Sequence, residues 1–357
     1  MNTSVIFVLF LISMISSFFA NAVFRSIAKK NKILIDLPDK NRKFHKRPTP
    51  LTGGISILFG SILAIFIAIN LEVIDLDYTA FNIYILICSA LIVFVFLYDD
   101  AFKISPRVRL LAQILICGLL IIFTKIFLAD LGNLVGIGNL RLGDFGPAFT
   151  IFCAVGIMNA FNMSDGINGL CSGLALLVFI FLGIFYNGFL GTQLIFALGA
   201  ISGFLIFNLG FIGKKRWVFL GDHGSNLLGF LVAYALIAGS QDDFFNLKPV
   251  TALWLVAIPL LDCIGLIAKR LYKNSAPFAA DRDHLHHRFM DAGYSSKHTL
   301  IIILISAAIV SLIGVLLQIY VAEYISFILF GIFTFMFYYL SHLLKLGIFD
   351  TKRKNHA

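Results

Sequence analysis

Long apolar runs alternate with short polar loops along the chain. Each run holds about 20 residues, the length that an α-helix needs to cross a bilayer. The pattern predicts about eleven membrane-spanning helices, at 3–23, 51–70, 79–98, 110–129, 147–163, 169–186, 192–212, 226–240, 250–268, 300–320 and 325–344. We therefore expect an all-α polytopic integral membrane protein.

Composition excludes the other protein classes. Of the 357 residues, 59% are hydrophobic and 13% are charged, and the mean hydropathy is +0.94. A soluble fold of this size could not bury so many apolar side chains. The same numbers exclude disordered and disulfide-rich classes. All five cysteines lie within apolar runs without C-x-x-C spacing, so we expect them to pack rather than to bind metal.

The distribution of Lys and Arg predicts the orientation. Of the 28 basic residues, all but Lys125, Arg141 and Lys248 lie in alternate loops, which the positive-inside rule places in the cytoplasm. The N-terminus is then outside and the C-terminus inside. No basic residue precedes the first apolar run, which favours an uncleaved helix over a signal peptide. The net charge of +9 therefore does not indicate nucleic-acid binding; it reflects either topology alone or the attraction of anionic lipids and phosphorylated substrates.

Four carboxylates lie at the predicted inner ends of apolar helices. Asp99 and Asp100 follow one run, Asp165 follows another, and Asp222 precedes a third. A carboxylate at the membrane face needs a partner, because its desolvation is costly. If the four converge, they form an oxygen-rich site that suits Mg²⁺ and phosphate. Asn162 lies three residues before Asp165 and can add an oxygen from the same helical face.

Three of the eight histidines, His284, His286 and His287, lie within four positions. A zinc site is one interpretation, but no cysteine lies nearby and consecutive histidines seldom complete a tetrahedral site. With Arg282, they are better suited to donate hydrogen bonds to a phosphate or a sugar.

Basic and glycine-containing segments are further candidates for phosphate contact. Lys43, His45 and Lys46 precede the second predicted span, where they are either topological charge or phosphate ligands. Gly221 and Gly224 flank Asp222 and would let the backbone approach a phosphate closely.

Five motifs, the first of them in three pieces, occur in the order known from one enzyme family. They are DLP at 36–38, RKFH at 42–45 and PTPLTGG at 48–54; DD at 99–100; NAFNMSDG at 159–166; GDHGS at 221–225; and DRDHLHH at 281–287. On these motifs the chain resembles the polyprenyl-phosphate N-acetylhexosamine-1-phosphate transferases of glycosyltransferase family 4. Phospho-MurNAc-pentapeptide transferase is a relative of that family.

The resemblance implies transfer of N-acetylhexosamine-1-phosphate from a UDP-sugar to undecaprenyl phosphate, with release of UMP. It implies the bacterial inner membrane, an active site on the cytoplasmic face, and the first membrane step of O-antigen or related envelope polysaccharide synthesis. One transferase domain over 1–357 would carry catalytic loops at 24–50, 99–109, 164–168, 213–225 and 269–299. Mg²⁺, replaceable by Mn²⁺, is the implied cofactor, and a homodimer is the alternative to a monomer.

The resemblance also suggests roles for single residues. Asp222 and Asn162 would hold the metal, Asp165 would complete the acidic cluster, and Asp99 or Asp100 would act on the lipid phosphate as base or nucleophile. The candidate substrate-binding residues are Lys43, His45, Lys46, Asn168, Arg282, His284, His286 and His287. The chain departs from the family pattern twice, with Asn168 in place of an Asp and His223 in place of a small residue.

Three alternatives remain open. Phospho-MurNAc-pentapeptide transfer is disfavoured because that enzyme carries a different histidine run. A transporter would place its charges near the membrane midplane and often shows inverted repeats, whereas these acids lie at helix ends. A non-catalytic relative that binds lipid phosphate would release no UMP.

Overall fold

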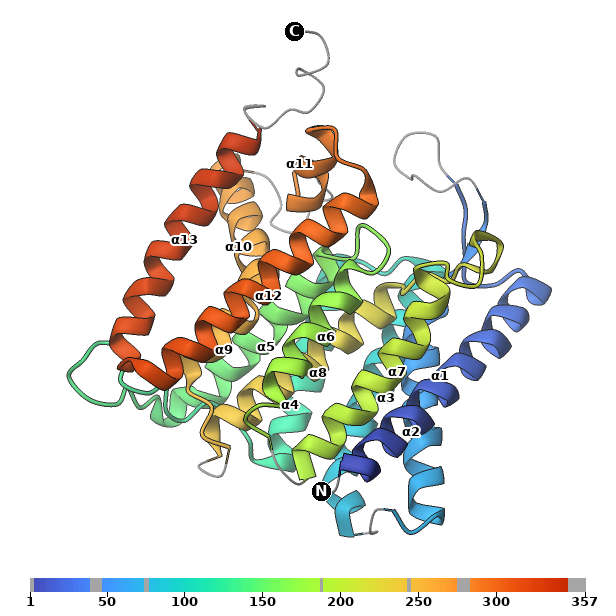
Figure 1. Cartoon of the computed structure of the whole chain (residues 1–357), viewed down its shortest axis with the longest axis horizontal. Helices are drawn as coiled ribbons and strands as arrows, with labels where there is room; N and C mark the ends of the chain where they lie inside the picture. The colour runs from blue at the N-terminus through green and yellow to red at the C-terminus, as the bar shows by residue number, and fades with distance from the viewer. Residues whose placement is uncertain are drawn as a thin grey trace, which may run out of the picture. The chain divides into compact units, whose positions relative to one another are not determined.

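The computed structural model describes residues 3–38, 47–73, 77–186, 189–242, 245–274 and 283–345. Helices dominate it (Figure 1). The chain divides into two compact units, Met1–Ile126 with Leu182–Leu231, and Phe127–Phe181 with Val232–Ala357. The single transferase domain expected over 1–357 stays a prediction.

The first unit is built from long helices and a short hairpin. Its elements are α1 (Thr3–Asn31), β1 (Ile35–Asp36), β2 (Thr49–Pro50), α2 (Gly53–Asn70), α3 (Asp77–Phe102), α4 (Pro106–Thr124), α7 (Phe189–Asn208), the 3₁₀ turn η2 (Lys214–Arg216) and the first half of α8 (Asp222–Gln241). The two strands pair antiparallel, and Leu51, directly after β2, forms a parallel bridge with Phe219. The hairpin is therefore joined to the segment that leads into α8.

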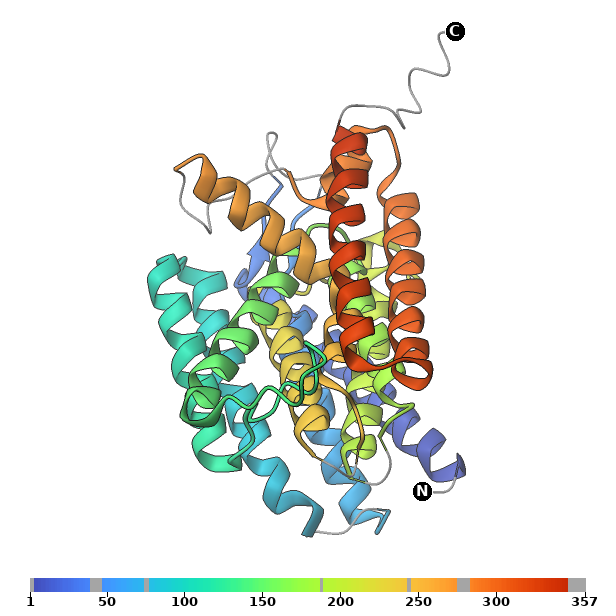
Figure 2. The ribbon, with the colours of Figure 1, turned by 90° about the vertical axis from the view of Figure 1, so that its left-hand side faces the viewer.

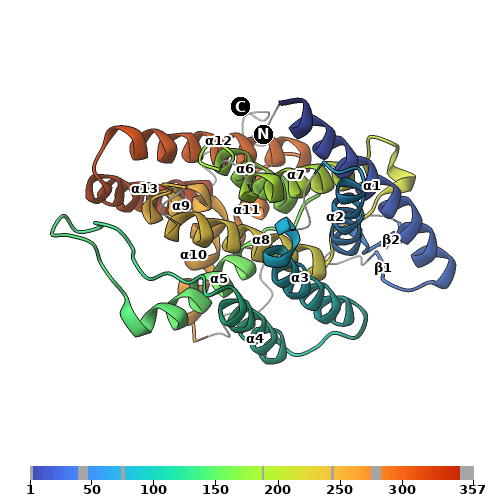
Figure 3. The same ribbon diagram turned by 90° about the horizontal axis from the view of Figure 1, so that it is seen from below.

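Small residues let α1 pack closely against α2 and α7, which lie side by side in Figures 1 and 3. A Cβ atom on Gly60 of α2 would lie 2.5 Å from the Cα atom of Ser17 in α1, and one on Gly199 of α7 would lie 2.5 Å from the Phe10 carbonyl oxygen. The hydroxyl of Ser13 donates to a carbonyl of α7 at 2.6 Å. Lipid weakens the hydrophobic drive for helix association, so close packing and hydrogen bonds hold these helices together.

The second unit carries the remaining helices. They are the 3₁₀ turn η1 (Gly143–Phe145), α5 (Gly146–Met163), α6 (Leu170–Leu182), the rest of α8, α9 (Pro249–Leu255), α10 (Ala257–Tyr272), α11 (Leu285–Asp291), α12 (Ser296–Tyr320) and α13 (Glu323–Lys345). Helices α12 and α13 form a hairpin that Figure 2 shows in profile. Trp254 of α9 donates from Nε1 to the Ser326 hydroxyl of α13 at 3.1 Å, which ties this hairpin to the bent pair α9–α10.

The span predicted at 250–268 corresponds to two helices that together are long and apolar enough for one broken span. Helices α9 and α10 meet there at 81°. Pro259 lies in the first turn of α10 and has no N–H group to donate to the carbonyl of Leu255. The hydrogen-bond ladder of α9 therefore cannot continue into α10, and the axis changes direction at Val256.

Among the described residues, eight helices are long and apolar enough to cross a membrane: α1, α2, α3, α4, α5 with η1, α7, α12 and α13. The protein is thus an all-α polytopic integral membrane protein. The predicted span at 169–186 corresponds to α6, which has only 13 residues, and the one at 226–240 lies in α8, outside those eight. The count of eleven and the orientation of the termini stay predictions.

Candidate active site

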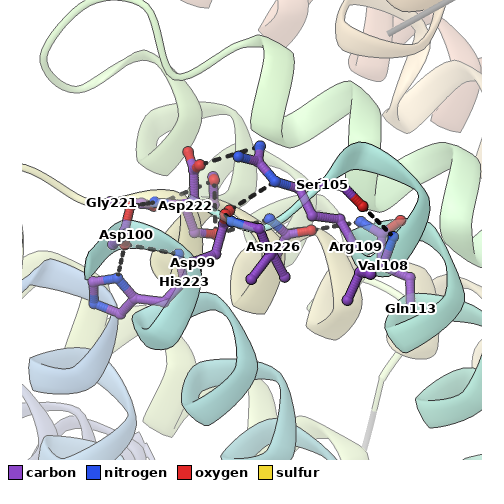
Figure 4. Close-up of polar contacts among 12 residues, drawn as sticks. Asp99, Asp100, Ser105, Val108, Arg109, Gln113, Gly221, Asp222, His223 and Asn226 are labelled. Carbon is purple, nitrogen blue, oxygen red and sulfur yellow. Dashed lines mark hydrogen bonds and ion pairs between the residues drawn. The ribbon is translucent and has the colours of Figure 1, made fainter. Parts of the chain in front are cut away.

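Three of the acidic residues expected to share a site lie together in the first unit (Figure 4). Asp99 and Asp100 belong to the last turn of α3, and Asp222 is the first residue of α8. The side chains of Asp99 and Asp100 are 0% and 3% exposed, whereas that of Asp222 is 33% exposed. Asp222 is therefore the acid that a substrate can reach most easily.

Asp100 caps the N-terminus of α8. Its Oδ1 atom accepts from the N–H of Asp222 at 3.2 Å, and its Oδ2 atom accepts from the N–H of His223 at 3.4 Å. Oδ2 also lies 2.6 Å from Nδ1 of His223, which carries the hydrogen because an ionised carboxylate only accepts. Gly221 permits this approach, since its φ is +79° and a Cβ atom there would lie 2.8 Å from Oδ2. The positive end of the helix dipole adds to the attraction.

Arg109 of α4 connects the two other acids. Its Nε atom lies 2.9 Å from Oδ2 of Asp99, an ion pair without hydrogen-bond geometry, and its Nη1 atom lies 3.5 Å from Oδ2 of Asp222. The cluster contains three carboxylates and the guanidinium of Arg109, which pairs with two of them. Even with the ring of His223 protonated, the cluster keeps an excess of negative charge that attracts a cation.

A tight turn between α3 and α4 positions Arg109. The N–H of Lys103, whose φ is +57°, donates to the carbonyl of Asp99 at 2.8 Å. The N–H of Ile104 donates to Oδ1 of Asp99 at 2.9 Å. Ser105 then caps α4, with a proline in the first helical turn. Asp99 thus closes the turn through the N–H of Ile104 and attracts the guanidinium of Arg109.

The glycine pair of the PTPLTGG motif lies against the start of α8. The N–H groups of Gly53 and Gly54 donate to the carbonyls of residues 219–220 at 3.0 and 3.1 Å. A Cβ atom on Gly54 would lie 2.5 Å from the backbone nitrogen of Gly224. The backbones of α2 and α8 therefore touch beside Asp222, and the motif has a structural role there.

The second unit holds the histidine segment. His284 is the N-cap of α11, its ring centroid lies 5.6 Å from that of His286, and the centroids of His286 and His287 are 4.2 Å apart. Burial, and then the neighbouring rings of His287 and His284, lower the pKa of His286 from 6.5 to about 3. The ring is neutral at physiological pH, and among the described residues its Nε2 atom has no hydrogen-bond partner.

Gly166 joins the histidine segment to the NAFNMSDG motif. The His286 ring occupies the space into which a Cβ atom on Gly166 would project. Asn162 lies in the last turn of α5, and Asp165 and Asn168 lie in the turn that follows it. The second unit therefore brings two of the predicted motifs side by side.

Other expectations stay predictions. Asp165, Asn162 and Asn168 belong to the second unit, whereas Asp222 belongs to the first. Among the residues that the structure describes, no three His, Cys, Asp or Glu side chains are grouped to hold a metal ion. Four expected substrate-binding residues lie outside the described part of the chain: Lys43, His45, Lys46 and Arg282.

Known proteins resemble this chain over most of its length. Residues 82–240 match the family described as Glycosyl transferase family 4. An undecaprenyl-phosphate alpha-N-acetylglucosaminyl 1-phosphate transferase of Escherichia coli (strain K12) is 36% identical over 337 residues, which are 93% of this chain and 88% of the relative. The chain belongs to glycosyl transferase family 4. Family members with the same description from Yersinia pestis and Haemophilus influenzae are 38% and 35% identical, over 88% and 91% of this chain and 84% and 91% of the relatives.

The matched family region contains every acid of the predicted cluster, Asp99, Asp100, Asp165 and Asp222. The histidine segment at 284–287 lies beyond it, within the length shared with the curated family members.

Sequence reasoning does not identify Arg109 as a member of the acid cluster. Arg109 lies in a basic loop, so the sequence groups it with the topological charge. A signal was present, since Arg109 directly precedes the apolar run that starts at Leu110. A cation at the membrane face needs a partner as much as an acid does.

Proposed function

We propose that the protein transfers N-acetylhexosamine-1-phosphate from a UDP-sugar to undecaprenyl phosphate and releases UMP. The names of the family members from Escherichia coli and Yersinia pestis support the acceptor and the transferred group. The proposal includes the bacterial inner membrane, an active site on the cytoplasmic face, and a place at the first membrane step of O-antigen or related polysaccharide synthesis. The proposal also includes a homodimer as the alternative to a monomer.

One observation carries the proposal beyond the family name. Asp222 presents a one-third exposed carboxylate at the start of α8, with Arg109 beside it and Asp100 fixing the backbone behind it. An anionic substrate that carries a cation fits such a mixed site, because the cation meets Asp222 while phosphate oxygens meet Arg109.

The donor set of the acid cluster fits Mg²⁺. Mg²⁺ takes oxygen ligands, often one or two carboxylates, and completes its shell with waters and substrate phosphates. A site of that kind needs no preformed group of three protein ligands. We assign the metal, Mg²⁺ or Mn²⁺, to Asp222 with Asn162 as the proposed second ligand. The metal would neutralise pyrophosphate oxygens and stabilise the departing UMP.

The chain's own residues would act mainly by positioning and charge. An oxygen of the lipid phosphate attacks the sugar-bearing phosphorus of the UDP-sugar, and such transfers need alignment and neutralisation of oxygens. Arg109 would balance charge on the phosphates. The oxygens of Asp99 and Asp100 already accept from or pair with protein donors, which favours roles in holding Arg109, Asp222 and His223 in place over attack on the substrate.

The predicted substrate-binding residues would contact the sugar nucleotide. Among the described residues, the Nε2 atom of neutral His286 has no hydrogen-bond partner and lies beside Gly166, so we propose that it donates to or accepts from a sugar or phosphate group. We place His284, His287 and Asn168 with it as substrate-binding residues. We propose Asp165 as a catalytic acid. Lys43, His45, Lys46 and Arg282 complete the proposed set.

A purified-protein assay tests the proposal. The protein in detergent is incubated with undecaprenyl phosphate, Mg²⁺ and each of a panel of UDP-sugars, including UDP-MurNAc-pentapeptide, and UMP release and lipid product are measured. We expect product with a UDP-HexNAc, and a loss on the order of 10³-fold for Asp222→Asn. Asp144→Asn, at an exposed carboxylate, is the control. The absence of a lipid-linked product with every donor would refute the proposal.

A further inference from the structure

An acid that the sequence analysis did not single out lies inside α10. Asp262 is buried, within a helix whose neighbouring residues Leu261 and Cys263 are apolar and buried as well. A buried carboxylate is costly unless it is hydrogen-bonded, so its partners indicate its purpose.

Both oxygens of Asp262 contact the first residues of α11. Oδ1 accepts from the N–H of Leu285 at 2.9 Å, and Oδ2 lies 3.1 Å from Nδ1 of His284. His284 is the N-cap of α11 but makes no capping hydrogen bond with its own side chain. The carboxylate of Asp262, on a neighbouring helix, therefore supplies the cap that the local sequence lacks.

This contact also determines which nitrogen of the His284 ring carries a hydrogen. An ionised carboxylate only accepts, so Nδ1 carries the hydrogen and Nε2 is left for another partner. The ring of His284 stacks on that of His286 with an interplanar angle of 15°, and His286 in turn contacts His287. A change in the orientation of one ring would therefore shift the other two.

A second acid holds the same segment without touching a ring nitrogen. Asp283 forms ion pairs with Lys269 of α10, with Arg288 of α11 at 3.5 Å and with Lys345 of α13 at 3.3 Å. Asp283 thus attaches α11 to its neighbours, whereas Asp262 controls the ring of His284.

We propose that Asp262 is a positioning residue for the histidine segment: its carboxylate sets the Nδ1–H tautomer of His284 and the start of α11, and so orients the rings that bind the sugar nucleotide. The catalytic part of this inference rests on the proposed function. The structural part, that Asp262 caps α11, does not.

The kinetic test uses Asp262→Asn, His284→Gln and the double variant in the UDP-HexNAc assay. We expect Asp262→Asn to lower kcat/KM for the sugar nucleotide by about 10- to 100-fold, as loss of a residue that orients a functional histidine does in other sites. Because Asp262 acts through His284, the double variant should be no slower than His284→Gln alone. Wild-type kinetics for Asp262→Asn, or effects that multiply in the double variant, would overturn the inference.

A matched variant separates the ring contact from the cap. Leu285→Pro removes the N–H that donates to Oδ1 but leaves the contact of Oδ2 with His284. Proline is well accepted at the first helical position, and the preceding residue already has φ −63° and ψ 152°, which proline requires. We expect a smaller kinetic loss than for Asp262→Asn. An equal loss would contradict the role of the ring.

Amide hydrogen exchange tests the cap of α11 independently of enzyme activity. In the full-length protein, Asp262→Asn should speed exchange across residues 285–291, whereas Asp144→Asn should not. If the wild-type protein makes no product with any donor, the proposed function fails, and exchange alone decides on the cap. Unchanged exchange in 285–291 for Asp262→Asn would refute it.

Discussion

The Nδ1 atom of His223 lies 2.6 Å from Oδ2 of Asp100, although 123 positions separate the two residues in the chain. The contact joins the last turn of α3 to the first turn of α8. It orders the backbone around Asp222, so the geometry of the accessible acid depends on two side chains that a substrate does not need to touch.

Replacement of Asp100 should weaken the fold and the reaction together. In Asp100→Asn, the amide can accept at only one of its two terminal atoms, and its NH₂ group then faces a donor at the start of α8. We expect the free energy of unfolding to fall by about 1–3 kcal/mol and UMP release to fall strongly. Thermal unfolding in detergent measures the first effect. Stability equal to that of Asp144→Asn would contradict the capping role.

Arg109 should be replaceable only in part by lysine. The planar guanidinium of Arg109 contacts both Asp99 and Asp222, and the single ammonium group of a lysine cannot reproduce this. We therefore expect Arg109→Lys to keep a fraction of the activity. Arg109→Gln leaves the fully buried Asp99 without its cation and should cost about 3 kcal/mol of stability. The matched control is Arg107→Gln, which removes an exposed charge from the same turn. Equal losses at both positions would rule out a specific role.

Neutral His286 should make the fold sensitive to acid. Burial lowers its pKa from 6.5 to about 3, so between these values the unfolded chain binds more protons than the folded protein. The free energy of unfolding therefore falls as the pH drops below about 6.5, by about 2 kcal/mol at pH 5 relative to pH 8. Unfolding midpoints between pH 5 and 8 measure this. In His286→Gln the decline should be smaller, and an identical decline would assign it to other groups.

Gly54 should not tolerate a side chain. A Cβ atom there meets the backbone of Gly224, so α2 and α8 would have to separate next to Asp222. We expect Gly54→Ala to cost about 1–3 kcal/mol and to reduce UMP release. Gly156→Ala is the control, because that helical glycine has open space around its missing Cβ atom. If both variants unfold at the same temperature, the helix crossing is looser than the structure indicates.

The grouping of Asp99, Asp100 and Asp222 could be predicted because charge topology and apolar runs together place helix ends on one face. The bend at Val256 could not, because apolar runs look alike whether the helix is straight or broken. Arg109 resembled the topological charge around it. Asp262 was missed for a different reason: one acid inside a long apolar run changes hydropathy little, and its partners come from a segment 22 positions later.

Two carboxylates in the last turn of α3 oppose the partial negative charge that a helix carries at its C-terminus. Asp99 is compensated locally, by the N–H of Ile104 and by Arg109, whereas Asp100 depends on a distant segment. The start of α8, 122 positions later, supplies the N–H groups that compensate Asp100. During synthesis, Asp100 therefore lacks these partners until residues 221–225 have left the ribosome, and a chain truncated before them would keep Asp99 and Asp100 but lose Asp222 and the contacts that hold Asp100.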